Sequence, residues 1–365
     1  MSQLDQIRNE INEIDVKMAA LFEQRMHLCE QVAAFKQERG LSVRDAARER
    51  ELIERSTACI ESEVIGSYYA QFLRKVIDLS CAYQTRLMEG MQVAYCGVEG
   101  AYAYIAARRM FPQARLVSYP DFSQAYHAVE RGEADSVVLP LENSYAGEVG
   151  TVMDLLFSGE LFINQVLDFD ITHNLLGVAS ATAGTVRTVV SHPQALRQCD
   201  DYIRSHGFKT ESYANTAMAA QRVREANDPT LAAIASDEAA EIFGLQVLDH
   251  NLSTSRNNTT RFAALSRTRN QPKTTGKRED ENFLLVFTVQ NDAGSLAQTL
   301  NIIGAHGYNM RTLRSRPMKD LSWKYFFYVE AEGSINTTNG REMLQELSAT
   351  CAKLRLVGSY YANNI

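Results

Sequence analysis

The sequence lacks the features that define several large classes of protein. It contains no run of about 18 apolar residues, so we expect no membrane-spanning helix. Its six cysteines are scattered, with no CxxC pair and no Cys/His cluster, which argues against a disulfide framework or a zinc site. Lys and Arg total 37 against 44 Asp and Glu, which argues against a general binder of nucleic acid or anionic membranes. The charged N-terminus has no signal-peptide core, so we expect a cytoplasmic protein.

Proline and glycine are scarce at the start of the chain. Residues 1–90 contain no proline, and their three glycines, Gly40, Gly66 and Gly90, are expected to punctuate three helical stretches. The length of 365 residues favours two or three domains. We place a helical domain at 1–90, an α/β domain at 91–266, a polar linker at 267–281 and a small α+β domain at 282–365.

The first helical stretch carries an apolar stripe whose members are three or four residues apart, except for one step of seven across Arg25: Leu4, Ile7, Ile11, Ile14, Met18, Leu21, Leu28, Val32 and Phe35. A helix of roughly 35 residues would be about 50 Å long. The two shorter helices that follow would leave part of this stripe uncovered, so we expect the chain to form a homodimer, or a tetramer built from such dimers.

Residues 91–266 alternate between short apolar runs and helical segments. The expected strands are Met91–Cys96, Leu116–Tyr119, Ser136–Leu139, Thr185–Val190 and Leu231–Ala235, and the expected helices are Ala103–Met110, Ser123–Arg131, Ala195–His206 and Ala217–Glu225. We expect the run Leu167–Gly177 to divide this region into two lobes, with a ligand at the carboxyl ends of the strands. After the linker, the segments follow a β-α-β-β-α-β order, which predicts a ferredoxin-like domain.

Cationic residues lie on the apolar stripe of the first helix. Arg25 falls between Leu21 and Leu28, and Lys36, eleven residues later, falls on nearly the same face. A lone arginine in such a place more often snorkels or pairs with a glutamate. The later helices add Asp45, Arg48 and Glu49, and then the polar pair Ser80 and Gln84. Together these side chains predict a pocket for a small dianion.

Residues 4–88 resemble the all-helical chorismate mutase domain, with matches at Arg8, Arg25, Lys36, Asp45, Arg48, Glu49, Ser80 and Gln84. The resemblance implies a pericyclic rearrangement of chorismate to prephenate without a covalent intermediate. It implies that Arg25 and the partner subunit's Arg8 hold the two carboxylates. It also implies that Lys36 and Gln84 donate to the ether oxygen, while Glu49 holds the ring hydroxyl.

The α/β region contains four polar strings, LPLENS (139–144), SHPQAL (191–196), NTA (215–217) and NNTTRF (257–262). Each alone reads as a turn or a helix cap. Together they resemble prephenate dehydratase over residues 92–266, which implies a two-lobed fold with the site in the cleft. The resemblance assigns the leaving-group contact to Thr260, within the string that ends at Phe262, and makes Arg261 the cation nearest the substrate. It lines the cleft with Glu142, Asn143, Ser191 and Gln198.

One loop departs from that family. Where hydroxyl residues are usual after the second glycine of Gly97–Ala103, this chain has Ala101 and Ala103, so two potential donors are missing.

The C-terminal region resembles the ACT fold of amino-acid sensors, which implies phenylalanine as the effector. The matching residues are Gly294, Ser295 and Leu296, Asn309, and then Arg314, Ser315, Arg316 and Pro317. Arg314 stands where that family usually has a glutamate. The alternative is a domain that only dimerises.

The sequence therefore predicts a bifunctional chorismate mutase–prephenate dehydratase controlled by phenylalanine, with chorismate and prephenate as substrates. Neither reaction requires a metal or an organic cofactor. Two alternatives stay open, an arogenate dehydratase with mutase activity and a non-catalytic, ACT-bearing amino-acid binding protein.

Overall fold

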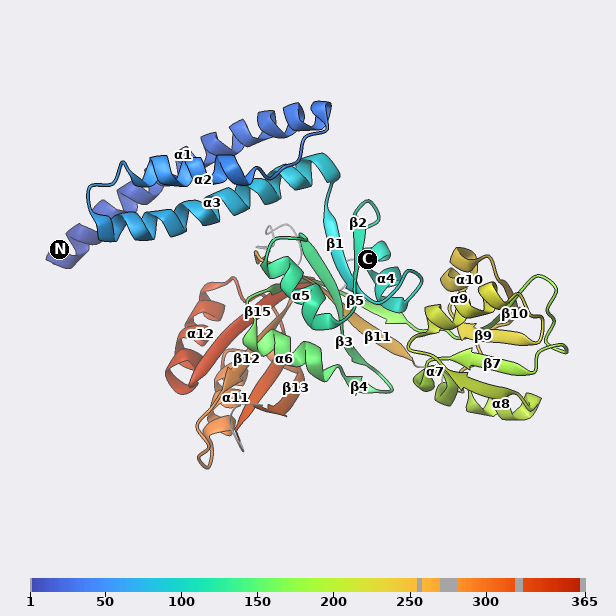
Figure 1. The fold of residues 1–365 in the computed structure, drawn as a ribbon. Helices are drawn as coiled ribbons and strands as arrows, with labels where there is room; N and C mark the ends of the chain where they lie inside the picture. The colour runs from blue at the N-terminus through green and yellow to red at the C-terminus, as the bar shows by residue number, and fades with distance from the viewer. Residues whose placement is uncertain (1, 255–257, 270–280, 319–323, 362–365) are drawn as a thin grey trace. The chain divides into compact units, whose positions relative to one another are not determined.

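The computed structural model describes residues 2–254, 258–269, 281–318 and 324–361 (Figure 1). The chain divides into two compact units, Met1–Gln92 and Val93–Ile365. Among the described residues, no helix has the length and apolar character needed to cross a membrane.

The first unit, the helical unit, consists of α1 (Gln3–Arg39), α2 (Ala46–Thr57) and α3 (Glu63–Glu89). A capping box between Ser2 and Asp5 begins α1, and Gly40 ends it with a left-handed backbone (φ 62°). The expected break at Gly66 is wrong, because Gly66 lies in the first turns of α3 and the break falls at 58–62. There the Ser62 hydroxyl caps α3 by accepting from the Ile65 N–H.

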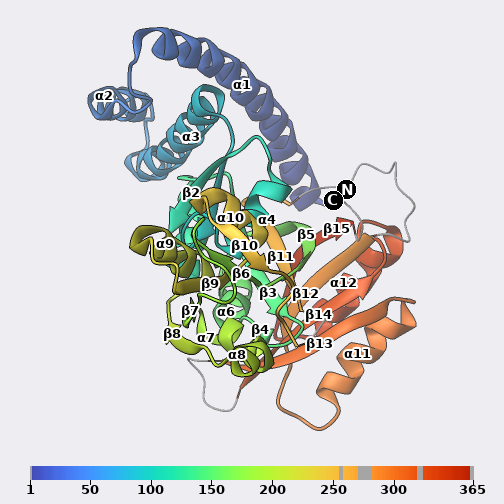
Figure 2. The same ribbon diagram turned by 90° about the vertical axis from the view of Figure 1, so that its right-hand side faces the viewer.

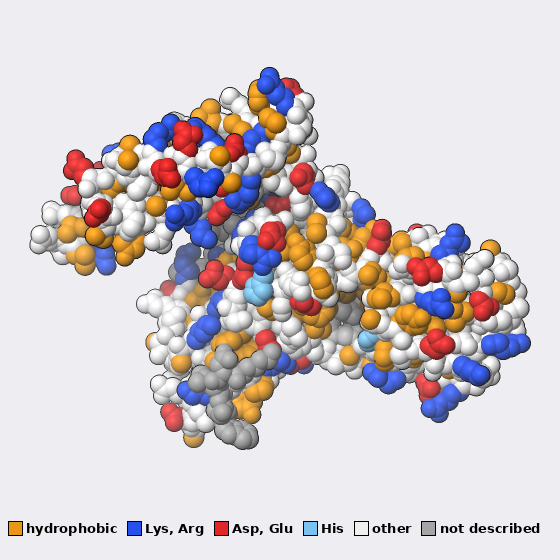
Figure 3. Space-filling model, viewed as in Figure 1, with side chains coloured by type: hydrophobic (Ala, Val, Ile, Leu, Met, Phe, Trp, Pro, Cys, Tyr) orange, Lys and Arg blue, Asp and Glu red, His pale blue; other side chains and the backbone are white. Residues whose placement is uncertain are grey.

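The apolar stripe of α1 is uncovered within its own chain. Every member predicted from the sequence is exposed, including Leu21 at 64% and Leu28 at 60%. Hydrophobic side chains are accordingly visible on the surface of the helical unit, between acidic and basic ones (Figure 3). The stripe therefore has the character of a contact surface for another protein chain.

The second unit contains a large sheet with strand order β13-β14-β12-β15-β5-β11-β3-β1-β2, with β4 paired to β3. Its first six strands in the chain are β1 (Gln92–Cys96), β2 (Arg115–Tyr119), β3 (Ser136–Asn143), β4 (Gly147–Glu148), β5 (Phe162–Asp170) and β11 (Thr259–Ser266). With helices α4 (Tyr102–Met110), α5 (Phe122–Glu130) and α6 (Gly150–Ser158), they form what we call the large lobe.

The small lobe is built on a second sheet of order β10-β6-β9-β7-β8. Its strands are β6 (Asn174–Gly177), β7 (Thr188–Ser191), β8 (Lys209–Ser212), β9 (Leu231–Ala235) and β10 (Gln246–Asp249), and its helices are α7 (Pro193–Gln198), α8 (Asp200–His206), α9 (Thr216–Ala226) and α10 (Asp237–Phe243). The division into two lobes between β5 and β6 confirms the expectation from the sequence.

The expected helix Ala195–His206 is broken at Cys199 into α7 and α8. Helices α6 and α10 and strands β4, β5, β6, β8, β10 and β11 were not predicted from the sequence. Strand β11 was missed because its polar start reads as a turn.

The C-terminal region follows the expected order, with β12 (Glu281–Thr288), α11 (Ser295–Ala305), β13 (Asn309–Pro317), β14 (Tyr325–Glu332), α12 (Thr338–Thr350) and β15 (Lys353–Tyr361). Both α11 and α12 cover one face of these strands (Figure 2). The other face buries Leu284 and Val286 in one core with Val152 and Met153 of α6. Strand β15 also pairs with β5, so this region continues the sheet of the large lobe.

The expected linker at 267–281 falls mostly on residues 270–280, which lie outside the described part. Its described beginning is bound to the large lobe, because Arg267 donates to the carbonyls of Val129 and Ala134.

Candidate active sites

The helical unit brings five of the predicted residues together, which we call the helical cluster: Arg25, Lys36, Glu49, Ser80 and Gln84. The Arg25 guanidinium donates to the buried Ser80 hydroxyl, which in turn donates to the Val76 carbonyl at 2.7 Å. Gln84 lies one turn further along α3 and is 6% exposed. Among the described groups its Oε1 has no hydrogen-bond partner. Buried polar atoms are normally paired, so this amide is a candidate ligand contact.

Lys36 and Glu49 flank the same space. Lys36 donates to the Val43 carbonyl, and Glu49 Oε1 lies 3.9 Å from the Cys81 sulfur. Burial raises the pKa of the Cys81 thiol, so this neighbour is neutral.

One residue near the helical cluster was not predicted from the sequence. Arg44 contacts Glu49 at 3.3 Å and Asp78 at 2.7 Å, linking α2 to α3. Its place in a short loop, outside any helical periodicity, gave no signal.

Three predicted residues lie outside the helical cluster in the single chain. Asp45 caps α2 by accepting from the N–H groups of Ala47 and Arg48. The Arg48 side chain is exposed and pairs with Glu51 at 3.0 Å. Arg8 is exposed on α1.

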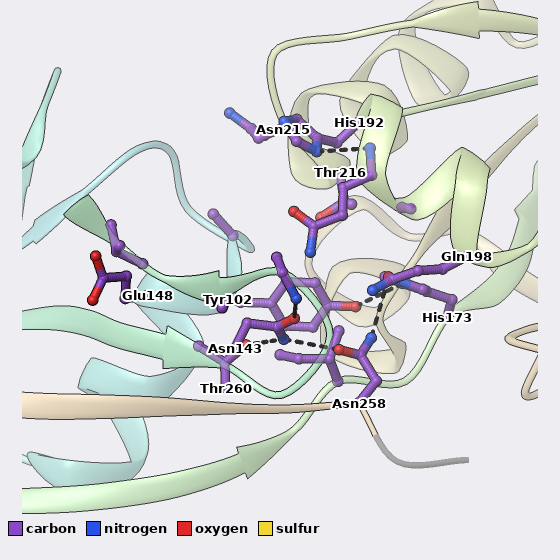
Figure 4. Close-up of a pocket in the computed structure, with 17 residues that line it drawn as sticks. Tyr102, Asn143, Glu148, His173, His192, Gln198, Asn215, Thr216, Asn258 and Thr260 are labelled. Atoms are coloured by element: carbon purple, nitrogen blue, oxygen red, sulfur yellow. Dashed lines mark hydrogen bonds between the residues drawn. The ribbon is translucent and has the colours of Figure 1, made fainter. Parts of the chain in front are cut away.

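A cavity of about 280 Å³ lies between the two lobes of the second unit (Figure 4). It is lined by the start of α4, the β3–β4 segment, the β5–β6 crossing, and the starts of α7 and α9. Its polar and charged lining residues are Tyr102, Asn143, Glu148, His173, His192, Gln194, Gln198, Asn215, Thr216, Asn258 and Thr260. Within the described residues, the lining includes no Lys or Arg.

Asn143 sets the direction of the hydrogen bonds in this cleft. Its Oδ1 accepts from the backbone N–H groups of Tyr145 (3.0 Å) and Ala146 (2.9 Å), which fixes the orientation of the amide. Its Nδ2 therefore donates to Asn258 Oδ1 at 2.8 Å and to Thr260 Oγ1 at 2.9 Å. Because Thr260 accepts this bond, its own hydroxyl hydrogen is left to donate.

The same chain of donors and acceptors continues into the small lobe. Asn258 Nδ2 donates to Gln198 Oε1 at 3.2 Å, and the His173 ring nitrogen Nε2 lies 2.8 Å from the same oxygen. The amide oxygen of Gln198 can only accept a hydrogen bond, so we assign the hydrogen of the neutral His173 ring to Nε2. Gln198 is 6% exposed, and among the described groups its Nε2 has no partner. This amide group is therefore a second buried donor available to a ligand.

Burial keeps the neighbouring titratable groups uncharged. It lowers the pKa of His173 and raises that of Tyr102 well above its usual range. The Tyr102 hydroxyl donates to the Thr172 carbonyl at 2.6 Å and lies 3.1 Å from His173 Nδ1.

Helices α4 and α9 both begin at the cleft. Helix α4 starts after Ala101, whose side chain makes no capping bond, and α9 starts after Asn215, which accepts from the Met218 N–H at 2.8 Å. The N-terminal end of a helix carries a partial positive charge and free N–H groups. The N-terminal ends of α4 and α9 thus provide the positive potential and hydrogen-bond donors that a Lys or Arg side chain would otherwise supply to an anion.

Four predicted cleft residues do not line the cavity, which corrects the sequence-based site. Successive residues of a strand face opposite sides. Arg261, next to Thr260, therefore points to the other face, where it contacts Asp168 and Glu330, each at 2.8 Å. Glu142 lies opposite Arg261 in the β3–β11 pairing and shares that face.

The other two are internal. The Ser191 hydroxyl is fully buried and donates to the Ile234 carbonyl at 2.6 Å. Phe262 is 2% exposed and packs edge-to-face on Phe169.

The predicted effector residues lie on neighbouring elements of the C-terminal region. Gly294, with φ 89°, precedes Ser295 and Leu296 at the start of α11, and Asn309 begins β13. Two of the predicted effector residues on β13, Arg314 and Arg316, are engaged elsewhere. Arg314 pairs with Glu142, and Arg316 contacts Glu148 at 2.6 Å and Asp154 at 3.1 Å.

Two family models match the regions that contain these sites. The family model of chorismate mutase type II matches residues 7–85, and that of prephenate dehydratase matches residues 93–270. A bifunctional chorismate mutase/prephenate dehydratase from Buchnera aphidicola is 29% identical over 98% of this chain and 96% of its own length. An arogenate dehydratase/prephenate dehydratase from Arabidopsis thaliana is 33% identical over 74% of this chain and 72% of its own length.

Two solved structures are similar to the second unit. GqqA, described as a novel type of quorum quenching acylase, has a TM-score of 0.68 and 31% identity over 74% of this chain and 98% of its own. Prephenate dehydratase from Arthrobacter aurescens in complex with L-Phe has a TM-score of 0.68 and 25% identity over 75% of this chain and 92% of its own.

The two domain matches are in the order of the full-length relatives and include the helical cluster and the cleft described above. The chain belongs to the family of bifunctional chorismate mutase/prephenate dehydratases, enzymes of phenylalanine biosynthesis with an isomerase and a lyase activity.

Proposed function

We propose that the cleft binds prephenate and expels its ring hydroxyl through Thr260. Prephenate loses carbon dioxide and hydroxide together: the C–C bond to the ring carboxylate breaks, its electrons aromatise the ring, and the C–O bond breaks. The Thr260 hydroxyl hydrogen-bonds the departing oxygen and stabilises the charge that develops there. A threonine hydroxyl is too weak an acid to be the ultimate proton source, so it donates a hydrogen bond or relays a proton.

The observation that carries this proposal is the fixed direction of the Asn143–Thr260 hydrogen bond. Two backbone N–H groups hold the Asn143 oxygen, so its nitrogen faces Thr260 and the threonine hydrogen is free. The group is thus oriented before the substrate arrives, which avoids reorganisation during the reaction.

The carboxylates of prephenate are held by neutral donors. The candidates are the N-terminal ends of α4 and α9 and the unpaired Nε2 of Gln198. This replaces the role that the sequence assigned to Arg261.

For the helical cluster, we propose that Arg25 and the partner subunit's Arg8 bind the two carboxylates of chorismate. Lys36 and Gln84 stabilise the ether oxygen as it gains charge, and Glu49 binds the ring hydroxyl. Asp45 and Arg48 join the site only when a partner subunit reshapes it. The proximity of Arg25, Ser80 and Gln84 within one chain supports this arrangement.

A single experiment tests both sites. Chorismate is supplied to the wild type, Thr260→Ala and Arg25→Ala, and prephenate and phenylpyruvate are quantified. We expect Thr260→Ala to accumulate prephenate, with a loss of about 100-fold or more in dehydratase kcat. Arg25→Ala should leave chorismate intact and still convert added prephenate. Loss of both activities in both variants would contradict two separate sites.

Arogenate is a second candidate substrate, because a relative carries both names. Arogenate has an ammonium group where prephenate has a ketone. A cleft that prefers arogenate would therefore be expected to offer that group an unpaired carboxylate. The lining carboxylate, Glu148, is already paired with Arg316 at 2.6 Å, which favours prephenate. A ratio of kcat/KM above one for arogenate over prephenate would reverse this preference.

The acylase activity named for GqqA does not suit this cleft. Acyl transfer through a hydroxyl needs an adjacent general base. Among the described residues, the side-chain contact of the Thr260 hydroxyl is the amide of Asn143, which is no base.

We also propose that phenylalanine binds the C-terminal region, which has the strand order of an ACT domain. The related dehydratase solved with L-Phe supports this, and Gly294, Ser295, Leu296, Asn309, Ser315 and Pro317 are the candidate contacts. Calorimetric titration with L-Phe, with dehydratase rates measured alongside, tests it. A C-terminal domain that only dimerises would give no heat of L-Phe binding. A chain that binds an amino acid without turnover would show no dehydratase rate.

A further inference from the structure

A layer of charged residues lies directly behind the cleft. Strands β3 and β11 present Asn143 and Thr260 to the cavity and, from the adjacent positions, Glu142 and Arg261 to the opposite face. Asn143 is thus the chain neighbour of Glu142, and Thr260 is that of Arg261. A movement of the charged residue therefore moves the cleft residue beside it.

The C-terminal region supplies the partners of this layer. Arg314 pairs with Glu142, and Glu330, only 1% exposed, accepts from Arg261 at 2.8 Å. Arg316 reaches two further elements, contacting Glu148 beside the cavity at 2.6 Å and Asp154 of α6 at 3.1 Å. All these side chains are buried or partly buried, where ion pairs are screened less than at the surface.

Gly150 provides the space that Arg316 occupies. A methyl group at Gly150, the first residue of α6, would lie 2.7–3.0 Å from the terminal atoms of the Arg316 guanidinium. A larger residue at this position would require the Arg316 guanidinium to move.

We propose that Arg314 and Arg316 are positioning residues of the dehydratase cleft, holding the β3–β4 wall and Glu148 through their ion pairs. They act through Glu142, Glu148 and Asp154 and do not touch the substrate. The inference rests on the proposed dehydratase function of the cleft. The proposal gives strand β13 a role in dehydratase catalysis, in addition to any role in binding an effector.

The principal test compares Arg316→Ala with Arg311→Ala in the full chain. Arg311 is on the same strand but pairs at 3.8 Å with Glu332, inside the C-terminal region. Displacing a catalytic group by about 1 Å can cost on the order of 100-fold in rate. We expect Arg316→Ala to lower dehydratase kcat by about 10- to 100-fold with a smaller change in KM. Arg311→Ala should match the wild type.

Circular dichroism and thermal unfolding of the same preparations report whether the second unit of each variant is folded, and mutase activity reports on the helical unit. Equal dehydratase kinetics for Arg316→Ala and Arg311→Ala, with the wild type active, would overturn the positioning role. An inactive wild type would instead contradict the proposed function.

Two further variants separate positioning from simple loss of charge. Gly150→Ala keeps Arg316 but displaces its guanidinium, so we expect the same direction of change in kcat with α6 intact. Glu148→Gln combined with Arg316→Ala should be no worse than Arg316→Ala alone, because both act through one contact. Strictly additive losses, or wild-type kcat in Gly150→Ala, would count against the proposal.

Discussion

At the scale of single residues, orientation matters more in this cleft than charge. The sequence suggested a substrate held by Arg261, yet the cavity places amides, a threonine and neutral histidines around the ligand space. The residue that organises them is Asn143, because backbone N–H groups fix its amide.

Asn143→Asp tests this directly. The carboxylate would still accept from the two backbone N–H groups but could not donate to Thr260, whose hydroxyl would then turn toward it. We expect dehydratase kcat to fall by about 100-fold or more, with mutase activity unchanged. Asn164→Asp makes the same chemical change where the amide donates to Ser266 and Thr268, away from the cleft, and is the matched control.

His173 gives a dependence of stability on pH. Its folded-state pKa is lowered by burial, while the unfolded chain keeps the usual value of 6.5. Above 6.5 both states are neutral at this residue, so it adds no pH dependence. As the pH falls below 6.5, the unfolded state takes up the proton first, and the free energy of unfolding decreases by at most about 1.4 kcal/mol per pH unit.

Urea unfolding of wild type and His173→Gln between pH 7.5 and roughly 5 measures this effect. We expect a shallower decline in the variant, while the exposed His250→Gln should follow the wild type. Parallel curves for wild type and His173→Gln would contradict a buried neutral histidine.

At the scale of elements, helix α4 shows the effect of the unusual loop before it. Its N-cap is Ala101, which makes no capping bond. Ala101→Ser should stabilise the chain by about 1 kcal/mol through a new cap. Since Ala101 also lines the cavity, the hydroxyl would face the substrate, so we expect the KM for prephenate to change as well. Ala103→Ser, one position inside α4, serves as the control for helix propensity, and an equal gain in stability there would argue against capping.

The elements also show what the sequence could and could not predict. The long α1 and the β-α-β-β-α-β order were predictable, because periodicity and glycine positions are local signals. Strand β11 was not, because its pairing with β3 and β5 is a long-range property. Because the strand was not predicted, the sequence offered no reason to expect that Arg261 and Thr260 face opposite sides of the sheet. His173 gave no signal either, since only the fold brings it to Gln198.

At the scale of the whole molecule, the exposed stripe of α1 and the exposed Arg8 make the homodimer predicted from the sequence a testable expectation. If Arg8 serves the partner's site, Arg8→Ala and Arg25→Ala subunits complement each other. A mixed dimer would contain one site with both arginines intact.

Mixing the two inactive variants, after dissociation and reassembly, should therefore restore about a quarter of wild-type mutase activity. Each variant alone, treated in the same way, is the control. Failure to regain activity despite formation of mixed dimers, seen by mass spectrometry of differently tagged chains, would place Arg8 outside the partner's site.

The pairing of β15 with β5 has an evolutionary consequence. A recombination event that exchanged the C-terminal region for another would break a shared sheet and leave the Leu284 and Val286 side of the α6 core unfilled. We therefore expect the large lobe and the C-terminal region to change by paired substitutions rather than by exchange of whole domains.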